Sequence, residues 1–499
     1  MALSVALRLV AAAGDYLVVV SETTAADGEW RHVVAALEKK YGADVVRHQG
    51  PVESLLPFNR SLPRFVCFVA RPEEVTREFV MRVNRLMRRL DDDPWPDAFY
   101  GILTGYDAAN ARRIAEQQEP LTVRRVAAGT EVSLAHCEEG VWFCELKAGR
   151  IVRQAKDGNS LESQGPADST AGLVQTLNEY RPDLFVTSGH ATERDWMIGF
   201  TYRNGYFRHQ AGKLYGEDTQ GRRLPIESPN PKIYLPVGNC LMGHIDQPDC
   251  MATSWMNGAG VHQMIGYTVP TWYGYAGWGM LDYFVEQPGR FTLAEAFLAN
   301  QLALLQRLQT YFPELLTAEV DDAGNARGPV RVTETARAAG LRAQDGRGLL
   351  FDRDVVAFYG DPAWVARMAS RPASLAWEQF YEATPEGLHT LEIRPRRGRD
   401  SFRPPNTNGS QRGGRPFVQF LPQRVGPATV LEGAEWQPVI ADNFILVPNP
   451  GVCEPDRTYR VRFRAEVLPE TGGASRRPSR PEVFRPEAVG REFNNRESP

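Results

Sequence analysis

The sequence predicts an α/β protein with a mainly parallel sheet, followed by a small all-β unit. Over most of the chain, short runs of β-branched and aromatic residues alternate with segments whose apolar residues recur at helical spacing. After about residue 385 the pattern changes to short alternating runs separated by Pro, Gly and Asn. Hydrophobic residues make up 42% of the chain and charged residues 24%, as in an ordinary globular protein.

A chain of 499 residues exceeds what one core normally organises, so we expect several units. The first residues are apolar and end in three alanines, which fits a signal peptide or an N-terminal extension. The last stretch is rich in Pro, Arg, Glu and Gly, and we predict that it is disordered. The predicted units are this N-terminal segment (1–14), a first α/β subdomain (15–125), a second α/β subdomain (126–370), a β sandwich (371–468) and the tail (469–499).

The first α/β subdomain contains three predicted strands and two predicted helices. Strands are indicated by "YLVVVS" from Tyr16, by residues 44–47 and by "FVCFVA" from Phe65. Residues 29–41 and 73–90 carry apolar side chains on one helical face. Strands separated by helices indicate a mainly parallel sheet with helices on its faces.

The second α/β subdomain shows four strand-like runs and one well-marked helix. The helix over 293–308 follows Thr292, and Glu295 completes a capping-box pattern. Pro236 counts slightly against a regular central strand, because proline cannot donate to the ladder. The runs lie near 141–146, 184–186, 233–237 and 261–267.

The all-β unit is predicted to be a small immunoglobulin-like sandwich. The Arg-rich residues 394–405 are interpreted as a solvated loop rather than a binding site for an acidic partner. The strand-like runs are "LHTLEI", "PFVQFL", "NFILVP" and "YRVRFRAEV".

Charge and cysteine content exclude several classes of function. The net charge of -4 gives no general attraction to nucleic acid, and no apolar segment is long enough to span a bilayer. Six cysteines in 499 residues are too few and too scattered for a disulfide scaffold. Composition alone therefore leaves the cellular compartment open.

Two reactive side chains follow two apolar runs of the second subdomain. His190 comes directly after "LFVTSG", and Cys240 comes directly after "KIYLPVGN". In an open parallel sheet, functional groups collect beyond the carboxyl ends of the strands, so neighbouring strands would bring these two side chains together. Their separation of 50 residues (240 − 190) leaves room for a helix and a crossover, and it is the His-to-Cys spacing of caspases.

The pair suits nucleophilic catalysis on a carbonyl. A thiolate attacks the carbonyl carbon, and a nearby imidazole helps generate the thiolate and protonates the departing amine. Tight turns after the strands would aim backbone N–H groups at the oxyanion. A lone cysteine after a strand is usually a buried small hydrophobe, and a lone loop histidine usually has no role, but their matched positions favour a functional pair.

Other chemistries find weaker support. Cys240, His244 and Cys250 contain zinc-ligand residue types, but their spacing matches no common zinc pattern, and neither His262 nor another residue is an obvious fourth ligand. "YGYAGWG" (273–279) lacks the lysine of a phosphate-binding loop, and we predict a mobile loop beside the pocket. No Gly-x-Ser-x-Gly motif of a serine hydrolase occurs.

Several segments resemble the gingipains, caspase-like cysteine peptidases of clan CD. "GHATERDW" from Gly189 resembles their His motif, and "NCLMGHIDQPDCMATSWMNGAGVHQMIGYTVPTW" from Asn239 is similar to the segment around their catalytic Cys. "PWPDAFYGILTGYDAANARRIAEQ" from Pro94 and "FYGDPAW" from Phe358 resemble the passage between their subdomains and the end of their catalytic domain. The resemblance covers about residues 15–365 and implies a caspase-like three-layer sandwich, with 126–370 as the catalytic subdomain.

The resemblance implies a role for individual residues. Cys240 corresponds to the nucleophile and His190 to the general acid or base. The N–H groups of Ala191 and Cys240 would form the oxyanion hole, although the family has Gly at the position of Ala191, where it would suit a positive φ or a close substrate. Trp272, with the adjoining Thr271, corresponds to a wall of the substrate pocket.

Two carboxylates follow His190 closely. Glu193 and Asp195 would orient its imidazole or contact a basic substrate, although a solvated loop carboxylate is the commoner case. The acid that makes some family members arginine-specific has no evident counterpart.

We therefore predict a cysteine endopeptidase that hydrolyses peptide bonds through a Cys–His dyad and a thioester. It requires no cofactor, and a structural calcium ion is implied by the resemblance only. We expect a protein or peptide substrate, a monomer, no nucleic-acid partner, and a location outside the cytoplasm. The first alternative is a catalytically idle caspase-like scaffold that binds peptides or proteins, which Ala191 favours. The second is a metal or redox protein that uses Cys240 and Cys250.

Overall fold

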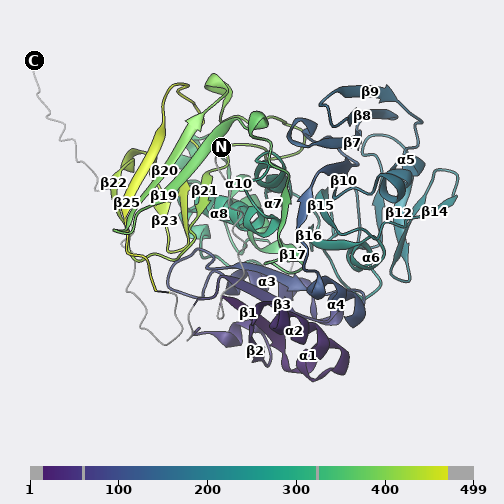
Figure 1. Cartoon of the computed structure of the whole chain (residues 1–499), viewed down its shortest axis with the longest axis horizontal. Coiled ribbons are helices and arrows are strands. Elements are labelled where there is room, and N and C mark those ends of the chain that lie inside the picture. The colour runs from purple at the N-terminus through teal and green to yellow at the C-terminus, as the bar shows by residue number, and fades with distance from the viewer. Residues whose placement is uncertain (1–14, 59–61, 322–324, 470–499) are drawn as a thin grey trace, which may run out of the picture.

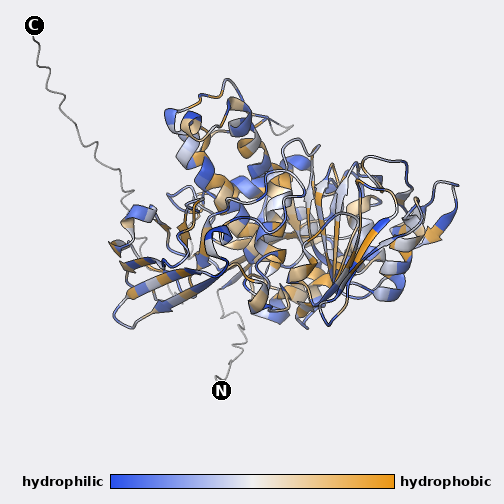
Figure 2. Cartoon of the chain, turned by 90° about the horizontal axis from the view of Figure 1, so that it is seen from above, coloured by the Kyte–Doolittle hydropathy of each residue, from blue (hydrophilic) through white to orange (hydrophobic). Residues whose placement is uncertain are grey.

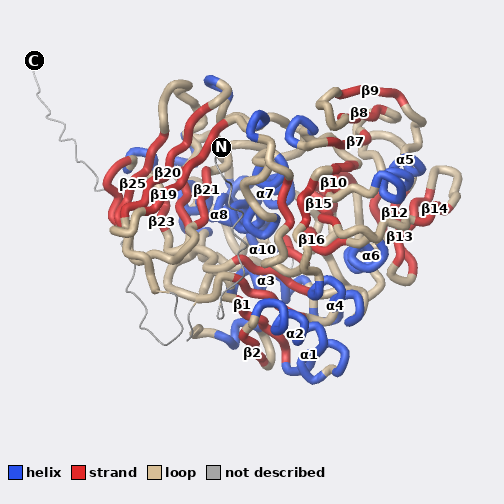
Figure 3. Tube along the Cα trace, in the orientation of Figure 1, coloured by secondary structure: helices blue, strands red, loops and turns tan. Residues whose placement is uncertain are grey.

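The computed structural model of the chain describes residues 15–58, 62–321 and 325–469. An α/β body is followed by a C-terminal β unit, and helices and strands interleave along the body (Figure 1, Figure 3). The predicted N-terminal segment (1–14) and the predicted tail after residue 469 lie outside the described residues.

One large sheet organises the α/β body, and hydrophobic residues run along its strands (Figure 2). Its strands are β1 (Tyr16–Ser21), β2 (Asp44–His48), β3 (Phe65–Val69), β4 (Phe99–Leu103), β6 (Arg125–Ala128), β7 (Glu139–Phe143), β8 (Arg150–Gln154), β9 (Ser160–Gln164), β10 (Leu184–Gly189), β15 (Lys232–Asn239), β16 (Val261–Tyr267) and β17 (Val356–Tyr359). Across the sheet their order is β2-β1-β3-β4-β17-β16-β15-β10-β6-β7-β8-β9.

The large sheet has two halves that run in opposite directions. β1 to β4 are mutually parallel, and so are β6, β7, β10, β15 and β16. β17 joins the halves, because it pairs in parallel with β4 and antiparallel with β16. The predicted sheets of the two α/β subdomains are therefore one continuous sheet. Its two halves present their carboxyl ends at opposite edges.

Helices cover both faces of this sheet. α2 connects β1 to β2 and α3 connects β3 to β4, in opposite directions along the sheet, so right-handed crossovers place them on opposite faces. α4 packs on α2, whereas α10 packs on α3 and on α8. The helices are α1 (Glu22–Ala26), α2 (Gly28–Tyr41), α3 (Arg77–Leu86), α4 (Ala108–Glu116), α5 (Thr170–Gln175), α6 (Met251–Gly258), α7 (Tyr275–Met280), α8 (Leu293–Tyr311), α9 (Glu334–Ala338) and α10 (Ala343–Val355).

Two predicted elements differ from the structure. The helix predicted over 73–90 is shorter, because Pro72–Glu74 forms a separate 3-10 turn and the Thr76 hydroxyl accepts from the N–H of Phe79 at 3.1 Å to start α3. The predicted mobile loop 273–279 is largely the buried helix α7.

Buried polar contacts hold α7 in place. The N–H of Ala276 donates to Asp352 at 3.0 Å, and the Asn300 amide donates to the carbonyl of Ala276 at 2.6 Å. The Tyr267 hydroxyl donates to the same Asp352 carboxylate at 3.0 Å. Gly-rich composition was therefore a misleading signal for mobility, because these partners lie far away in the sequence.

Pro236 does lie within a central strand. β10 and β15 pair in parallel, and their register shifts between Thr187, opposite Pro236, and Ser188, opposite Gly238. The shift skips one residue of β15 at the point where proline offers no N–H, so a local irregularity accommodates it.

Two smaller sheets complete the α/β body. One is an antiparallel meander inserted between β10 and β15, and the other pairs two short strands in parallel. The meander consists of β11 (Asp195–Met197), β12 (Tyr206–Gln210), β13 (Lys213–Glu217) and β14 (Arg223–Pro225), and the pair consists of β5 (Leu121–Val123) and β18 (Ala366–Met368).

The C-terminal β unit consists of two antiparallel sheets around a small core. Ile445 and Val447 face this small core, whereas Phe444 and Leu446 belong to the core of the α/β body. The inner sheet is thus buried on both faces, which docks the unit on the body. Its immunoglobulin-like type stays a prediction. The sheets are β19 (Trp377–Ala383), β20 (Leu388–Pro395), β25 (Tyr459–Arg464) and β22 (Thr429–Glu432), and β21 (Phe417–Phe420), β24 (Phe444–Val447) and β23 (Val439–Ile440).

Candidate active site

The ends of β10 and β15 position the two predicted catalytic side chains. The strands are parallel neighbours, and Gly189 pairs in register with Asn239. His190 directly follows β10 and Cys240 directly follows β15, so both residues leave the sheet at the same carboxyl edge. Neighbouring strands lie about 4.8 Å apart, so the register alone places the two residues next to each other.

A buried polar network fixes the two strand ends. The Thr187 hydroxyl donates to Asn239 Oδ1 at 2.6 Å and lies 2.9 Å from the hydroxyl of Tyr234. The Asn239 amide then donates across the strands to the carbonyl of Gly189 at 3.0 Å. Thr187 and Asn239 are fully buried. These bonds hold the residues that directly precede His190 and Cys240.

Cys240 is half-buried, and it is the exception among the cysteines of the described residues, since the other five are buried. Its Sγ accepts the N–H of Thr271 at 3.2 Å, and the Thr271 hydroxyl donates to the carbonyl of Asn239 at 3.0 Å. Thr271, predicted to bind substrate, therefore lies against the candidate nucleophile.

His190 is exposed, and its ring stacks on Phe200. The ring centroids are 4.8 Å apart and the planes are inclined at 26°. In this arrangement no hydrogen bond joins the imidazole to Cys240 within the described part of the chain. Catalytic hydrogen bonds in unliganded enzymes are often long and tighten only with substrate.

Ala191 and Cys240 carry free backbone donors. Ala191 bridges Trp196 as a non-hydrogen-bonded pair, because the bonds run from Thr192 N to Asp195 O and from Met197 N to His190 O. Across residues 15–58, 62–321 and 325–469, the N–H groups of Ala191 and Cys240 meet no acceptor.

The backbone angle of Ala191 shows whether this position needs a glycine. Gly189, two residues earlier, has φ 100°, whereas Ala191 is not among the residues with positive φ. A side chain at this position therefore causes no backbone strain, and its N–H donates as a glycine N–H would.

The two predicted acidic residues do not contact His190 through their carboxylates. The Thr192 hydroxyl donates to the Asp195 carboxylate at 3.0 Å, whereas Glu193 takes part through its backbone, whose carbonyl accepts the N–H of Met251 at 2.9 Å. Among the described contacts none joins either carboxylate to His190. Trp272, in contrast, is 70% exposed next to Thr271 and can meet a substrate.

The zinc interpretation finds no support in the geometry. Cys250 is fully buried at the start of α6, where its sulfur lies 3.4 Å from the Thr253 hydroxyl, and burial raises the pKa of its thiol. Burial also lowers the pKa of His244. Within the part of the chain that the structure describes, no group of three or more His, Cys, Asp or Glu side chains could hold a metal ion.

A buried carboxylate lies on the same edge and escaped sequence reasoning. Glu145 follows the end of β7, and its Oε1 accepts the Thr130 hydroxyl at 2.5 Å. Its Oε2 is buried without a hydrogen-bond partner in the described residues. The backbone carbonyl of Glu145 accepts the N–H of Phe200 at 2.7 Å, so this segment also anchors the ring that stacks on His190.

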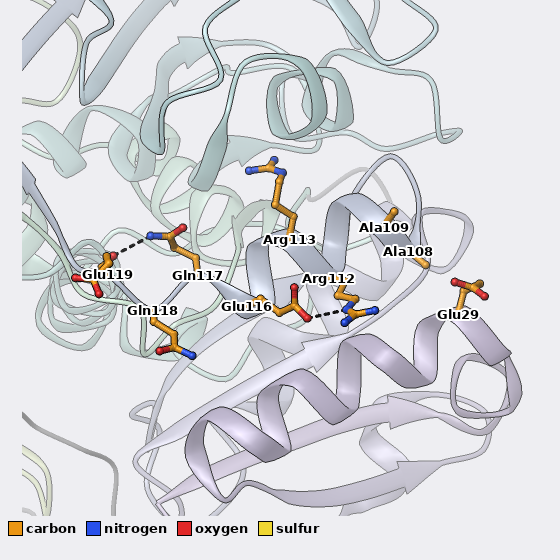
Figure 4. A pocket seen from close by; sticks show the side chains of 9 residues that line it. All are labelled: Glu29, Ala108, Ala109, Arg112, Arg113, Glu116, Gln117, Gln118 and Glu119. Atoms are coloured by element: carbon orange, nitrogen blue, oxygen red, sulfur yellow. Dashed lines mark hydrogen bonds and ion pairs between the residues drawn. The ribbon is translucent and has the colours of Figure 1, made fainter.

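Two hollows of the surface lie away from this edge. One of about 550 Å³ lies along α4 and the start of α2, where Arg112 and Glu116 form a hydrogen bond of 2.7 Å (Figure 4). Another of about 370 Å³ lies at the opposite, amino ends of β6 and β7, between Arg125, Glu139 and Asp183. Mixed charges line both, and neither includes His190 or Cys240.

Known proteins resemble this chain in backbone structure but not in sequence. No protein-family model and no curated protein matches the chain. Its backbone is similar to the Arg-specific cysteine proteinase gingipain R, with a TM-score of 0.40 and 10% identity over 91% of this chain and 98% of that chain. It is also similar to a structure described as a protease, with a TM-score of 0.41 and 10% identity over 92% of this chain and 96% of that one. At such scores the comparisons assign no activity to this chain.

Among the described residues, no helix combines the length and the apolar character needed to cross a bilayer.

Proposed function

We propose that this protein is a cysteine endopeptidase in which Cys240 is the nucleophile and His190 the general acid and base. The observation that carries the proposal is the register of β10 and β15, which sets an exposed imidazole and a half-buried thiol on the adjacent ends of two parallel strands. The N–H of Thr271 also donates to Cys240 Sγ, so the loop that carries Thr271 and Trp272 lies against the proposed nucleophile.

The chemistry would proceed in two steps. His190 accepts the thiol proton, and the Cys240 sulfur attacks the peptide carbonyl carbon, with the oxyanion held by the free N–H groups of Ala191 and Cys240. The carbon–nitrogen bond breaks as the imidazolium protonates the leaving amine. Water, deprotonated by His190, then attacks the thioester and releases the acid and the thiol. No step in this sequence requires a metal ion.

Neighbouring side chains suit a peptide substrate. Phe200, which stacks on His190, is 50% exposed, and Trp272, next to Thr271, is 70% exposed, so both rings are open to contact with a bound peptide. The negative φ of Ala191 removes the main argument for an idle scaffold, because its N–H needs no glycine to donate. The monomeric state and the location outside the cytoplasm stay predictions from the sequence, which gives no side-chain preference for the substrate.

The test is hydrolysis of an unstructured protein such as casein by the wild type, by His190→Ala and by His32→Ala. His32 is an exposed histidine on α2, in the other half of the sheet, and serves as the matched control. We expect His190→Ala to lower the rate by about 100-fold to 10,000-fold, the usual contribution of a general acid or base, and His32→Ala to leave it unchanged. Equal rates for the three proteins would refute the dyad.

A further inference from the structure

A loop of the C-terminal β unit reaches the candidate active site. Residues 406–415, here called the strap, lie between β20 and β21 and contact the α/β body. Ser410 Oγ donates to the carbonyl of Tyr273 at 3.1 Å, directly after Trp272. The strap therefore contacts the loop whose Thr271 lies on Cys240.

Buried ion pairs anchor the strap. Arg412 Nε donates to Asp282 at 2.7 Å and Arg412 also pairs with Glu286, while Arg415 Nε donates to Asp282 at 3.0 Å. All four side chains are at most 7% exposed. Removing one partner of such a buried pair leaves an uncompensated charge, so the strap is held firmly on the body.

The strap also packs on a ring beside the nucleophile. A Cβ on Gly409 would lie 2.3 Å from the Trp278 ring, so only glycine allows this approach. On the β15 side, a Cβ on Gly238 would lie 3.1 Å from the same ring. Trp278 thus fills the space between the strap and a residue two positions before Cys240.

Asn408 extends the contact to the other flank of the site. Its amide donates to Glu145 Oε1 at 3.1 Å and to the Thr130 hydroxyl at 3.3 Å. Glu145 in turn holds Phe200 through its backbone carbonyl, and Phe200 stacks on His190. The strap therefore touches the surroundings of both members of the candidate dyad.

We propose that the strap forms a wall of the substrate cleft and that Asn408 is a positioning residue that fixes the Glu145 segment and thereby sets side-chain preference. This inference rests on the proposed peptidase function. It assigns the C-terminal β unit a direct part in substrate selection, in place of a purely targeting or packing role. Loss of a hydrogen bond to a charged group should change peptide recognition about ten-fold.

The experiment compares two reagents on intact protein by mass spectrometry. Iodoacetamide reports the reactivity of Cys240 alone, whereas a panel of peptidyl acyloxymethyl ketones with Arg, Lys, Asp or Ala at the terminal position also requires the cleft. For Asn408→Ala we expect an unchanged iodoacetamide rate, with peptidyl rates lowered and their ratios changed about ten-fold. Gly409→Ala, which pushes the strap from Trp278, should change the same ratios. Asn449→Ala is the control, because Asn449 bonds only within the β unit.

The outcomes separate the two proposals. If the wild type reacts with no peptidyl reagent, the peptidase proposal fails whatever the strap does. If the wild type reacts and Asn408→Ala and Gly409→Ala match Asn449→Ala in every ratio, the strap has no part in recognition and this inference is overturned.

Discussion

The two edges of the β10–β15 half of the sheet treat polar groups in opposite ways. At the amino edge, fully buried Lys232 donates to the carbonyls of Ser228 at 2.5 Å, of Asn230 at 2.8 Å and of Ala259. Asp183 there accepts the N–H groups of Arg124 and Arg125, both at 2.9 Å. Each of these ionisable groups has protein partners, so the amino edge is built for stability.

At the carboxyl edge, donors and rings remain available. The N–H groups of Ala191 and Cys240 have no acceptor in the described residues, and Phe200 and Trp272 are exposed. Unpaired donors and exposed rings contribute little to folding, but they are what a substrate requires. The contrast teaches that satisfied polar groups indicate structure and unsatisfied ones indicate function, and the following changes test it.

The largest effect is expected from Cys240→Ala at the carboxyl edge. Turnover should fall at least about 1,000-fold because the nucleophile is lost, while the free energy of unfolding changes by less than about 1 kcal/mol because the thiol is half-buried. Casein hydrolysis and urea unfolding measure the two quantities. Cys453→Ala, in the β unit, is the control for removal of a thiol. Substantial residual turnover in Cys240→Ala would move the nucleophile elsewhere.

Lys232→Met, at the amino edge, should lower stability and leave turnover unchanged. Three carbonyls lose their donor, so we expect unfolding to become easier by about 3 kcal/mol, with the rate per folded molecule unchanged. Urea unfolding and active-site titration measure these. If Lys232→Met were as stable as the wild type, the hydrogen bonds of the amino edge would not contribute to stability as we expect.

His262, also at the amino edge, should make stability depend on pH. Arg113 donates to its Nε2 at 3.2 Å and its Nδ1 lies 2.9 Å from the carbonyl of Gly260, which requires the neutral ring. Burial lowers the pKa of His262 to about 4. Between pH 6.5 and 4 the unfolded chain binds a proton that the folded chain does not, so stability falls as pH falls.

The free energy of unfolding should fall by about 3 kcal/mol between pH 6.5 and pH 4 because of His262. His262→Gln should remove that part of the pH dependence, which unfolding curves between pH 4 and 7 would reveal. His32→Ala is the matched control, since His32 is exposed. An unchanged slope in His262→Gln would contradict the neutral buried ring.

The smallest effect is expected from Ala191→Gly. Since Ala191 already has a negative φ, its N–H should donate as well as that of glycine, and turnover should stay within about three-fold. Stability should fall by about 0.5–1 kcal/mol through the extra freedom of glycine in the unfolded chain. A large gain in turnover would show that the alanine impairs the oxyanion hole.

The sequence predicted the strand ends because their signal is local. "LFVTSG" and "KIYLPVGN" are apolar runs that stop where β10 and β15 stop, so His190 and Cys240 were identifiable. The capping box of Thr292 and Glu295 was likewise found where predicted.

Long-range features could not be predicted in this way. The direction of β17 depends on packing between β4 and β16, and a run of four residues carries no signal for it. Asn408 and Glu145 are 263 residues apart, and neither stands in a recognisable motif. A polar Thr187 inside an apolar run was the one local hint of the network behind the candidate dyad.

The central claim is tested most directly by intact-mass spectrometry after brief exposure to peptidyl acyloxymethyl ketones, with Cys240→Ala and His190→Ala alongside. The account predicts one covalent adduct on the wild type, located at Cys240, absent from Cys240→Ala and much slower in His190→Ala. An adduct at another cysteine, or none from any probe on folded protein, would contradict it.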